Sequence, residues 1–217
     1  MNNLIKISVS RICAIICIIC ASLSIAVLVL LVVFSKTAKE VTSFTLYSSF
    51  LVIFYIITAI YHFFPFQMKA KKVFYILSHA FFITMVWGVY IPPCLISLES
   101  GWGWSFFGII TGVCVTGISL RSVFSYRWRG FSETIYYFIL NWTWIITISE
   151  MSKAVGEYGV ILYLTGFLLL NISMVFYRLA MYEINKRYTL FLPLFYTLLI
   201  LSNICHAVFM FRYVAKI

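Results

Sequence analysis

The chain has 217 residues, of which 64% are hydrophobic and only 10% are charged. About a quarter of the residues in a soluble domain are charged, so this composition excludes a soluble protein and predicts one that lies in a lipid bilayer. A net charge of +10 would suggest nucleic acid in a soluble protein, but here the basic residues stand in short segments between apolar stretches. Anionic lipid headgroups are the nearer partner. We therefore expect membrane lipids as partners, and no nucleic acid.

Apolar stretches of membrane-spanning length recur along the chain. A helix needs about 20 residues to cross the hydrocarbon core. Seven stretches predict an all-α polytopic membrane protein with seven transmembrane helices in one bundle, at about residues 12–34, 42–64, 73–96, 103–125, 131–149, 159–180 and 189–213. The first is longer than the apolar core of a signal peptide, about 15 residues at most, so we expect it to remain as a helix. The linkers are short, and residues 1–217 are expected to form a single domain.

The basic residues are distributed unequally between the two ends of the predicted helices. If the amino terminus is cytoplasmic, the inner side holds 11 of the 16 lysines and arginines: Lys6, Arg11, Lys69, Lys71, Lys72, Arg121, Arg127, Arg129, Arg178, Lys186 and Arg187. The positive-inside rule therefore predicts a cytoplasmic amino terminus and an outer carboxyl terminus. The linkers 65–72, 126–130 and 181–188 would then lie in the cytoplasm.

Small residues recur at helical spacing within the predicted helices. All six cysteines fall in helices rather than in loops, which indicates packing residues and not disulfides. Cys13, Cys17 and Cys20 share one face of the first helix, and a metal or acylation role for that face is the alternative. Gly108 and Gly112 form a G-x-x-x-G pattern, which predicts close packing against another helix.

Polar side chains inside a membrane are costly, so those within the predicted helices are candidates for function. Thr58 and His62 lie four residues apart on one face of the second helix, and Tyr55 extends that face. Ser78 is six residues past Lys72, about 9 Å into the third helix. Because the second helix runs inward, these groups can meet near the cytoplasmic boundary. The alternative for His62 is an interfacial ring that is hydrogen-bonded to water.

Several segments together resemble one family. Residues 58–62 (Thr-Ala-Ile-Tyr-His) and 77–80 (Leu-Ser-His-Ala) are similar to the S-x-x-Y-H and D-H-A signatures of the hemolysin III and progestin/adiponectin receptor family of seven-helix membrane proteins. Further segments resemble that family at residues 88–92, 101–104, 141–142 and 166–177. The resemblance covers nearly the whole chain from the second helix onward. The short chain is similar to the bacterial branch, which implies an integral protein of the bacterial cytoplasmic membrane.

In that family, the histidine of the first signature and two histidines of the last helix hold a zinc ion. The resemblance makes His62 the first zinc ligand. His206 matches another histidine of the family's last helix, and this match aligns that helix with the family's sequence. Counting back 10 and 14 residues from His206 places Tyr196 and Leu192 at the other two ligand positions, while Ser78 replaces the acidic residue. A catalytic zinc site generally needs three protein ligands. Leucine cannot ligate, and tyrosine coordinates only after losing a proton that it holds up to about pH 10. His62 is therefore expected to be only a remnant ligand, and no cofactor is expected.

The remaining two histidines are expected to lie away from this site. His79 follows Ser78 but is turned about 100° around the helix, which predicts a packed or lipid-facing ring. His206 stands 19 residues beyond Arg187, about 28 Å across the bilayer, so it is expected near the outer face and out of reach of His62.

The leading interpretation is a hemolysin III type protein that keeps the bundle and a lipid-accessible cavity but lacks zinc-dependent hydrolase activity. Its role would be structural or regulatory, in membrane lipid homeostasis, through a bound lipid or a partner membrane protein. The candidate cavity residues are Tyr55, Thr58, His62, Ser78, Leu192 and Tyr196, and Thr58 and Ser78 also stand at motif positions that the resemblance associates with catalysis.

Two other interpretations stay open at this stage. The first is a hydrolase of a membrane-lipid acyl or amide bond, with a metal, such as zinc, held by His62 and unexpected groups such as Tyr196 or the cysteine face. A Ser-His-Asp triad is excluded because the chain has no aspartate. The second is a pore-forming cytolysin or channel, although the helices supply neither a ring of charges nor a continuous polar stripe.

Overall fold

The computed structural model describes residues 2–65, 69–98, 101–124, 131–182 and 188–216, and every regular element in these ranges is a helix. The elements in chain order are α1 (Asn2–Val33), α2 (Ala38–Phe63), α3 (Lys69–Pro92), the π-helical η1 (Pro93–Ser97), α4 (Gly101–Phe124), α5 (Phe131–Trp142), the 3-10 helix η2 (Thr143–Thr147), α6 (Ile148–Tyr182), α7 (Tyr188–Phe209) and the π-helical η3 (Met210–Val214). The all-α prediction is confirmed. Helices satisfy their own backbone hydrogen bonds, which a bilayer requires of any segment that crosses it.

Membrane-length helices make up most of the described chain. Within the described ranges, six segments are long and apolar enough to cross a membrane: Ser8–Val33, Ala38–Phe63, Lys69–Ser97, Gly101–Phe124, Thr134–Met181 and Phe191–Val214. The fifth has 48 residues, more than twice the length that one crossing needs.

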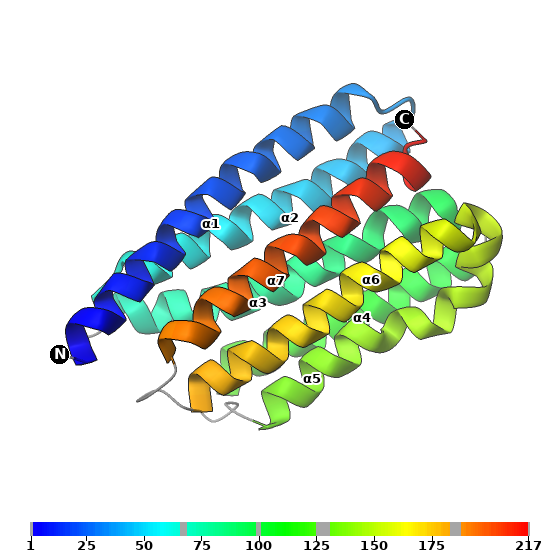
Figure 1. Ribbon diagram of the computed structural model, residues 1–217. Coiled ribbons are helices and arrows are strands. Elements are labelled where there is room, and N and C mark those ends of the chain that lie inside the picture. Colours follow the sequence, from blue (N-terminus) through cyan, green and yellow to red (C-terminus); the bar gives the residue numbers. More distant parts are fainter. Residues whose placement is uncertain (1, 66–68, 99–100, 125–130, 183–187, 217) are drawn as a thin grey trace.

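The chain reverses direction within this fifth segment. Gly156 has φ 75° and ψ 170°, a backbone conformation that glycine adopts without steric cost. The hydroxyls of Tyr137 and Tyr177 both lie 2.8 Å from ring nitrogens of His79, although a straight helix would hold residues so far apart in sequence about 60 Å from each other. Figure 1 shows α6 turning back beside α5. The sequence predicted a non-helical linker between residues 149 and 159, but these residues are helical except at Gly156.

The sequence sets both ends of α2 locally. The Thr37 hydroxyl accepts a hydrogen bond from the backbone N–H of Glu40, and the Glu40 carboxylate accepts one from the N–H of Lys36. These bonds satisfy backbone donors that the first turn of a helix leaves unpaired. At the other end, Phe64 is extended because it precedes Pro65, which disfavours helical geometry in the preceding residue.

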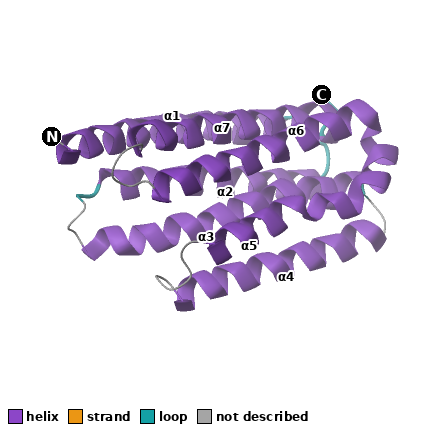
Figure 2. Cartoon of the chain, turned by 60° about the horizontal axis from the view of Figure 1, so that its bottom comes forward, coloured by secondary structure: helices purple, strands orange, loops and turns teal. Residues whose placement is uncertain are grey.

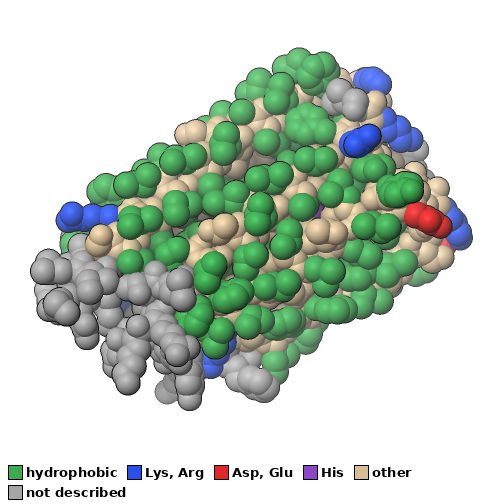
Figure 3. Space-filling view, in the orientation of Figure 1, with side chains coloured by type: hydrophobic (Ala, Val, Ile, Leu, Met, Phe, Trp, Pro, Cys, Tyr) green, Lys and Arg blue, Asp and Glu red, His purple; other side chains and the backbone are tan. Residues whose placement is uncertain are grey.

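The helices pack mostly against their neighbours in the chain. Helix α1 packs on α2 and α7, α3 lies between α2 and α4, and α6 packs on α7 and α5. Figure 2 shows α1 and α4 at opposite edges of the bundle. Figure 3 shows hydrophobic side chains over most of the visible face, with Lys and Arg side chains toward the two ends. This surface suits a lipid environment.

The glycines of α4 differ from their predicted role. A Cβ atom added to Gly108 or Gly112 would meet nothing within 4 Å, so the close packing predicted for this pair is wrong. Both residues are exposed on the outer side of the helix. The close approaches of α4 occur instead at Gly103, where an added Cβ would overlap the Cys94 carbonyl oxygen of η1, and at Gly117, where it would overlap the hydroxyl of Tyr136 on α5.

Candidate functional site

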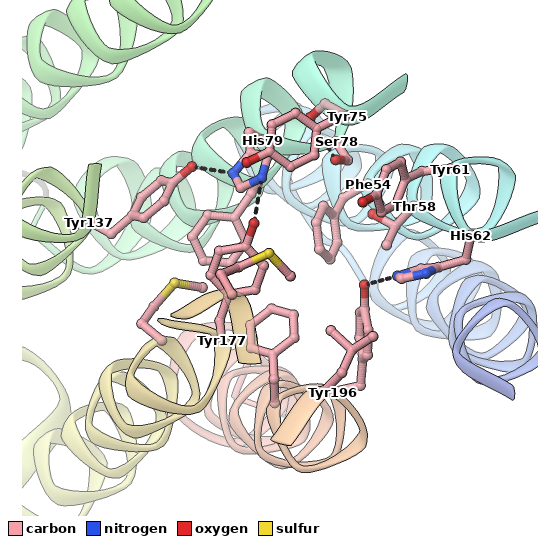
Figure 4. Close-up of a pocket in the computed structure, with 15 residues that line it drawn as sticks. Phe54, Thr58, Tyr61, His62, Tyr75, Ser78, His79, Tyr137, Tyr177 and Tyr196 are labelled. Atoms are coloured by element: carbon pink, nitrogen blue, oxygen red, sulfur yellow. Dashed lines mark hydrogen bonds between the residues drawn. The ribbon is translucent and has the colours of Figure 1, made fainter. Parts of the chain in front are cut away.

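A small cavity lies between α2, α3, α5, α6 and α7 (Figure 4). It leaves about 40 Å³ in which the centre of a water molecule can sit, which is room for about three waters. Its wall combines aromatic, methionine and leucine side chains with hydroxyl and imidazole groups: Phe54, Thr58, Tyr61, His62, Tyr75, Ser78, His79, Phe82, Tyr137, Met174, Tyr177, Met181, Leu192, Phe195 and Tyr196. An apolar wall with a few polar groups is typical of ligand pockets.

His62 links three helices through its ring and its backbone. Its Nε2 lies 2.5 Å from the Tyr196 hydroxyl on α7, and its Nδ1 lies 3.2 Å from the Ser10 hydroxyl on α1. Ser10 also donates a hydrogen bond to the backbone carbonyl of His62 at 2.9 Å. Only 3% of His62 is exposed, so an interfacial ring in water is excluded.

These bonds define the protonation of the His62 ring. A serine hydroxyl carries one hydrogen, and Ser10 uses it on the His62 carbonyl. The Ser10 oxygen therefore accepts from Nδ1–H, which leaves the Nε2 lone pair to accept the hydroxyl hydrogen of Tyr196. A metal-ligating histidine has the same arrangement, with one nitrogen donating to a neighbour and the other turned toward the metal. In this chain, the Tyr196 hydroxyl occupies the position where a metal would bind to Nε2.

His79 forms a second link, which the sequence did not predict. Its two ring nitrogens lie 2.8 Å from the hydroxyls of Tyr137 on α5 and Tyr177 on α6. The ring also packs at 4.6 Å from that of Tyr75. The His79 ring is packed, as predicted, but the expectation that it faces away from the site is wrong. The reversal at Gly156 brings α5 and α6 against this face of α3, and the cavity extends across to them.

The other predicted site residues fall into two groups. Thr58, Ser78 and Leu192 line the cavity with His62 and Tyr196. Tyr55 does not, because its hydroxyl accepts a hydrogen bond from Asn203 on α7 at 2.7 Å, outside the cavity.

The hydroxyls of Thr58 and Ser78 differ in their hydrogen bonding. The Ser78 hydroxyl donates to the Tyr75 carbonyl of its own helix at 2.9 Å. Thr58 is 3% exposed, and among the residues that the structure describes its hydroxyl has no hydrogen-bond partner. Figure 4 shows Thr58 beside Phe54 on the cavity wall. An occupant with an acceptor or donor group could therefore satisfy Thr58.

Two cations lie behind the aromatic wall of the cavity. The Lys71 ammonium is 4.9 Å from the centre of the Tyr61 ring and donates to the Phe64 carbonyl at 2.8 Å. The Arg121 guanidinium lies 4.7 Å from the centre of the Tyr75 ring and is fully buried. No carboxylate lines the cavity among the residues that the structure describes. The local charge thus favours a neutral or anionic occupant.

The histidine of α7 is separate from this cavity. The His206 ring is fully buried, with ring centres 4.8 Å from Phe167 and 5.8 Å from Tyr163 on α6. An added Cβ at Gly166 would lie 2.6 Å from its Nε2, so glycine is what allows α6 to approach α7 here. His206 does not line the cavity, and its ring packs between α7 and α6.

The residues at the position of the family's zinc ion do not fit a metal. Leu192 offers no ligating atom, and Tyr196 donates its hydroxyl hydrogen to the Nε2 lone pair that a metal would need. In the described part of the chain, no three His, Cys, Asp or Glu residues are grouped so that they could hold a metal ion. Cys13, Cys17 and Cys20 are buried without a disulfide and face the bundle interior.

Membrane-length helices around a cavity with polar groups define a polytopic helical membrane protein. The chain belongs to the haemolysin-III related family, whose profile it matches over residues 11–207. Hemolysin-3 of Bacillus cereus is 29% identical over 160 residues, which is 72% of each chain. The Hemolysin-3 homolog of Bacillus subtilis strain 168 is 25% identical over 158 residues, 71% of this chain and 73% of that one. No protein of known structure shows significant similarity.

Proposed function

We propose that this chain is a metal-independent hemolysin III type membrane protein whose cavity binds a membrane lipid, with a structural or regulatory role in membrane lipid homeostasis. The observation that carries the proposal is the bond between the Tyr196 hydroxyl and Nε2 of His62. This hydrogen bond occupies Nε2 of His62, and His62 is the only residue of this chain that matches a zinc ligand of the family. A hydrolase with a metal-activated water would need that nitrogen free.

The proposed topology has seven membrane crossings, with the amino terminus in the cytoplasm. The reversal at Gly156 supports two crossings by the fifth apolar segment, because a 48-residue segment that turns back on itself gives two helices of bilayer length. The excess of basic residues on one side supports the orientation. The two Bacillus relatives support the cytoplasmic membrane of a bacterium as its location.

The chemistry of the cavity supports a lipid as the occupant. Its wall is largely apolar, it lies within membrane-spanning helices, and the unpartnered Thr58 hydroxyl offers a hydrogen bond to a polar group. The nearby Lys71 and Arg121 favour an occupant that is neutral or negatively charged. A lipid headgroup with oxygen acceptors meets these requirements. The cavity volume fits a few polar atoms of such a group rather than a whole lipid.

Zinc analysis of the purified protein tests the metal-independent part of the proposal. We expect wild-type protein to carry little zinc. Replacing both Leu192 and Tyr196 with histidine should restore three histidines around the cavity and give about one equivalent of zinc, since the two positions lie one helical turn apart on α7. Adding His62→Ala to this double variant should remove the zinc, which controls for adventitious binding.

One result would replace the proposal with the hydrolase alternative. If wild-type protein already carries a full equivalent of zinc, and if His62→Ala removes it, the metal site is intact and Tyr196 must move to admit it. The contact between the Ser10 hydroxyl and Nδ1 of His62 supports this alternative, because it holds the ring as a metal-ligating histidine is held.

A further inference from the structure

A second concave site lies on the other side of α2, between α1 and α2. Each helix contributes one stripe at i, i+3, i+4 and i+7 spacing, and Phe64 closes one end: the lining residues are Ile18, Ala21, Ser22, Ile25, Ile56, Ala59, Ile60, Phe63 and Phe64. The small side chains of Ala21, Ser22 and Ala59 leave this groove about 500 Å³ in which the centre of a water molecule can sit. It is therefore far larger than the cavity at His62.

The wall of this groove is apolar and faces the surroundings of the bundle. Ile18, Ile25 and Ile56 are 44–49% exposed, and Phe63 is 68% exposed. The only polar side chain, Ser22, donates its hydroxyl hydrogen to the Ile18 carbonyl of its own helix. The side chains that line the groove offer an occupant no unmet hydrogen-bond donor. The occupant that fits such an apolar wall is a hydrocarbon chain.

Positive charge stands at one end of the groove. Arg11 is exposed and continues the α1 stripe, because it precedes Ile18 by seven residues, or about 10 Å. The bonds from Ser10 to His62 place this part of α1 level with the end of α2. At that same end, the Lys71 ammonium lies 2.8 Å from the carbonyl oxygen of Phe64.

From these observations we infer that the groove binds one anionic phospholipid, with an acyl chain between α1 and α2 and its phosphate at Arg11. The apolar wall matches the chain, and the cation at its end matches the phosphate. This site is distinct from the cavity, since the groove residues and the cavity residues Thr58 and His62 occupy opposite sides of α2. The inference does not depend on whether the cavity binds a lipid or a metal.

Native mass spectrometry of the full chain released from nanodiscs of equimolar phosphatidylglycerol and phosphatidylcholine tests the inference. We expect wild-type protein to retain about one phosphatidylglycerol. Ser22→Phe fills the groove from α1 and Ile56→Trp fills it from α2, so each should abolish retention. Two variants are used so that a folding defect in one does not decide the result. Ile19→Phe places the same phenyl ring at an exposed position outside the groove and should retain the lipid.

The headgroup is tested separately. Arg11→Gln should keep a lipid in the groove but lower the preference for phosphatidylglycerol over phosphatidylcholine about fivefold, which is the effect of one basic residue near an anionic surface. Lys39→Gln, at the opposite end of α2, should leave the preference unchanged.

Four results would overturn the inference. Retention that persists in both filled variants, or that Ile19→Phe also abolishes, would show that the lipid binds elsewhere. An unchanged headgroup preference in Arg11→Gln would remove the phosphate assignment. A dimer that Ser22→Phe dissociates would show that a second copy of the chain covers this groove.

Discussion

The bond between His62 and Tyr196 can be measured with a double-mutant cycle. Tyr196→Phe removes only the hydroxyl, and His62→Ala removes the ring that accepts from it. In His62→Ala, Ser10 keeps its hydrogen bond to the backbone carbonyl at position 62. The cycle therefore isolates the side-chain pair without disturbing the link from α1 to the backbone of α2.

The expected magnitude follows from the surroundings of the pair. A buried polar atom that loses its partner costs about 1–3 kcal/mol. The cavity beside the pair has room for about three waters, and a water that replaces the lost hydroxyl lowers this cost. Hydrogen bonds between helices in membrane proteins average about 0.6 kcal/mol in such cycles, with a maximum of about 1.7. We expect a coupling energy of about 1 kcal/mol, with Tyr196→Phe alone lowering stability by a similar amount.

Reversible unfolding in mixed detergent micelles, followed by circular dichroism, supplies the four free energies. A parallel cycle that pairs His62→Ala with Tyr158→Phe is the control, because Tyr158 is 81% exposed and its change should add within about 0.5 kcal/mol. A coupling energy near zero for the test pair would refute the assigned bond. It would mean that the Tyr196 hydroxyl and the His62 ring each bond to another partner. Nε2 of His62 would then be free to bind a metal.

Two further predictions concern the bundle itself. Gly166→Ala should lower the free energy of unfolding by about 1–3 kcal/mol, because its Cβ would lie 2.6 Å from Nε2 of His206, whereas Gly112→Ala, with nothing within 4 Å, should not lower it. Denaturation of both variants checks this, and failure of an added His206→Ala to recover stability would contradict the explanation. A cysteine introduced at Lys69 should react with a membrane-impermeant thiol reagent only from the cytoplasmic side, and one at Lys153 only from outside. The opposite pattern would invert the proposed topology.

The sequence predicted the helices better than the connections between them. Apolar stretches determine where a chain can cross a bilayer, so the helical segments agree with the structure to within a few residues at most ends. Helix α1 is an exception, since it begins at Asn2 rather than near residue 12. The turn at Gly156 was predicted as an interruption of nine residues, because Ser, Lys and Glu around it suggest a loop. A single glycine is enough to reverse the chain, and the flanking residues remain helical.

The candidate site was predictable where it depends on register within one helix. The i, i+4 spacing of Thr58 and His62, and the count along α7 to Tyr196, correspond to residues that share the cavity. The partners from other helices were not predictable. Ser10, Tyr137 and Tyr177 contact the two histidines only because of how whole helices are placed, and one sequence contains no signal for that placement. The sequence around a lone tyrosine in an apolar helix is the same whether the tyrosine faces lipid or a histidine of another helix.

The two histidines together join six helices of the bundle. His62 joins α1, α2 and α7, and His79 joins α3, α5 and α6, each using both ring nitrogens. A structural zinc ion contributes about 10–16 kcal/mol to folding in small zinc domains, whereas one hydrogen bond between membrane helices contributes about 1 kcal/mol. In the metal-independent protein that we propose, hydrogen bonds to tyrosine supply only part of the stabilisation that such a metal cross-link would give. The double-histidine variant should therefore bind zinc and also become more stable in its presence, since the added metal would reinforce helices that packing already holds in place.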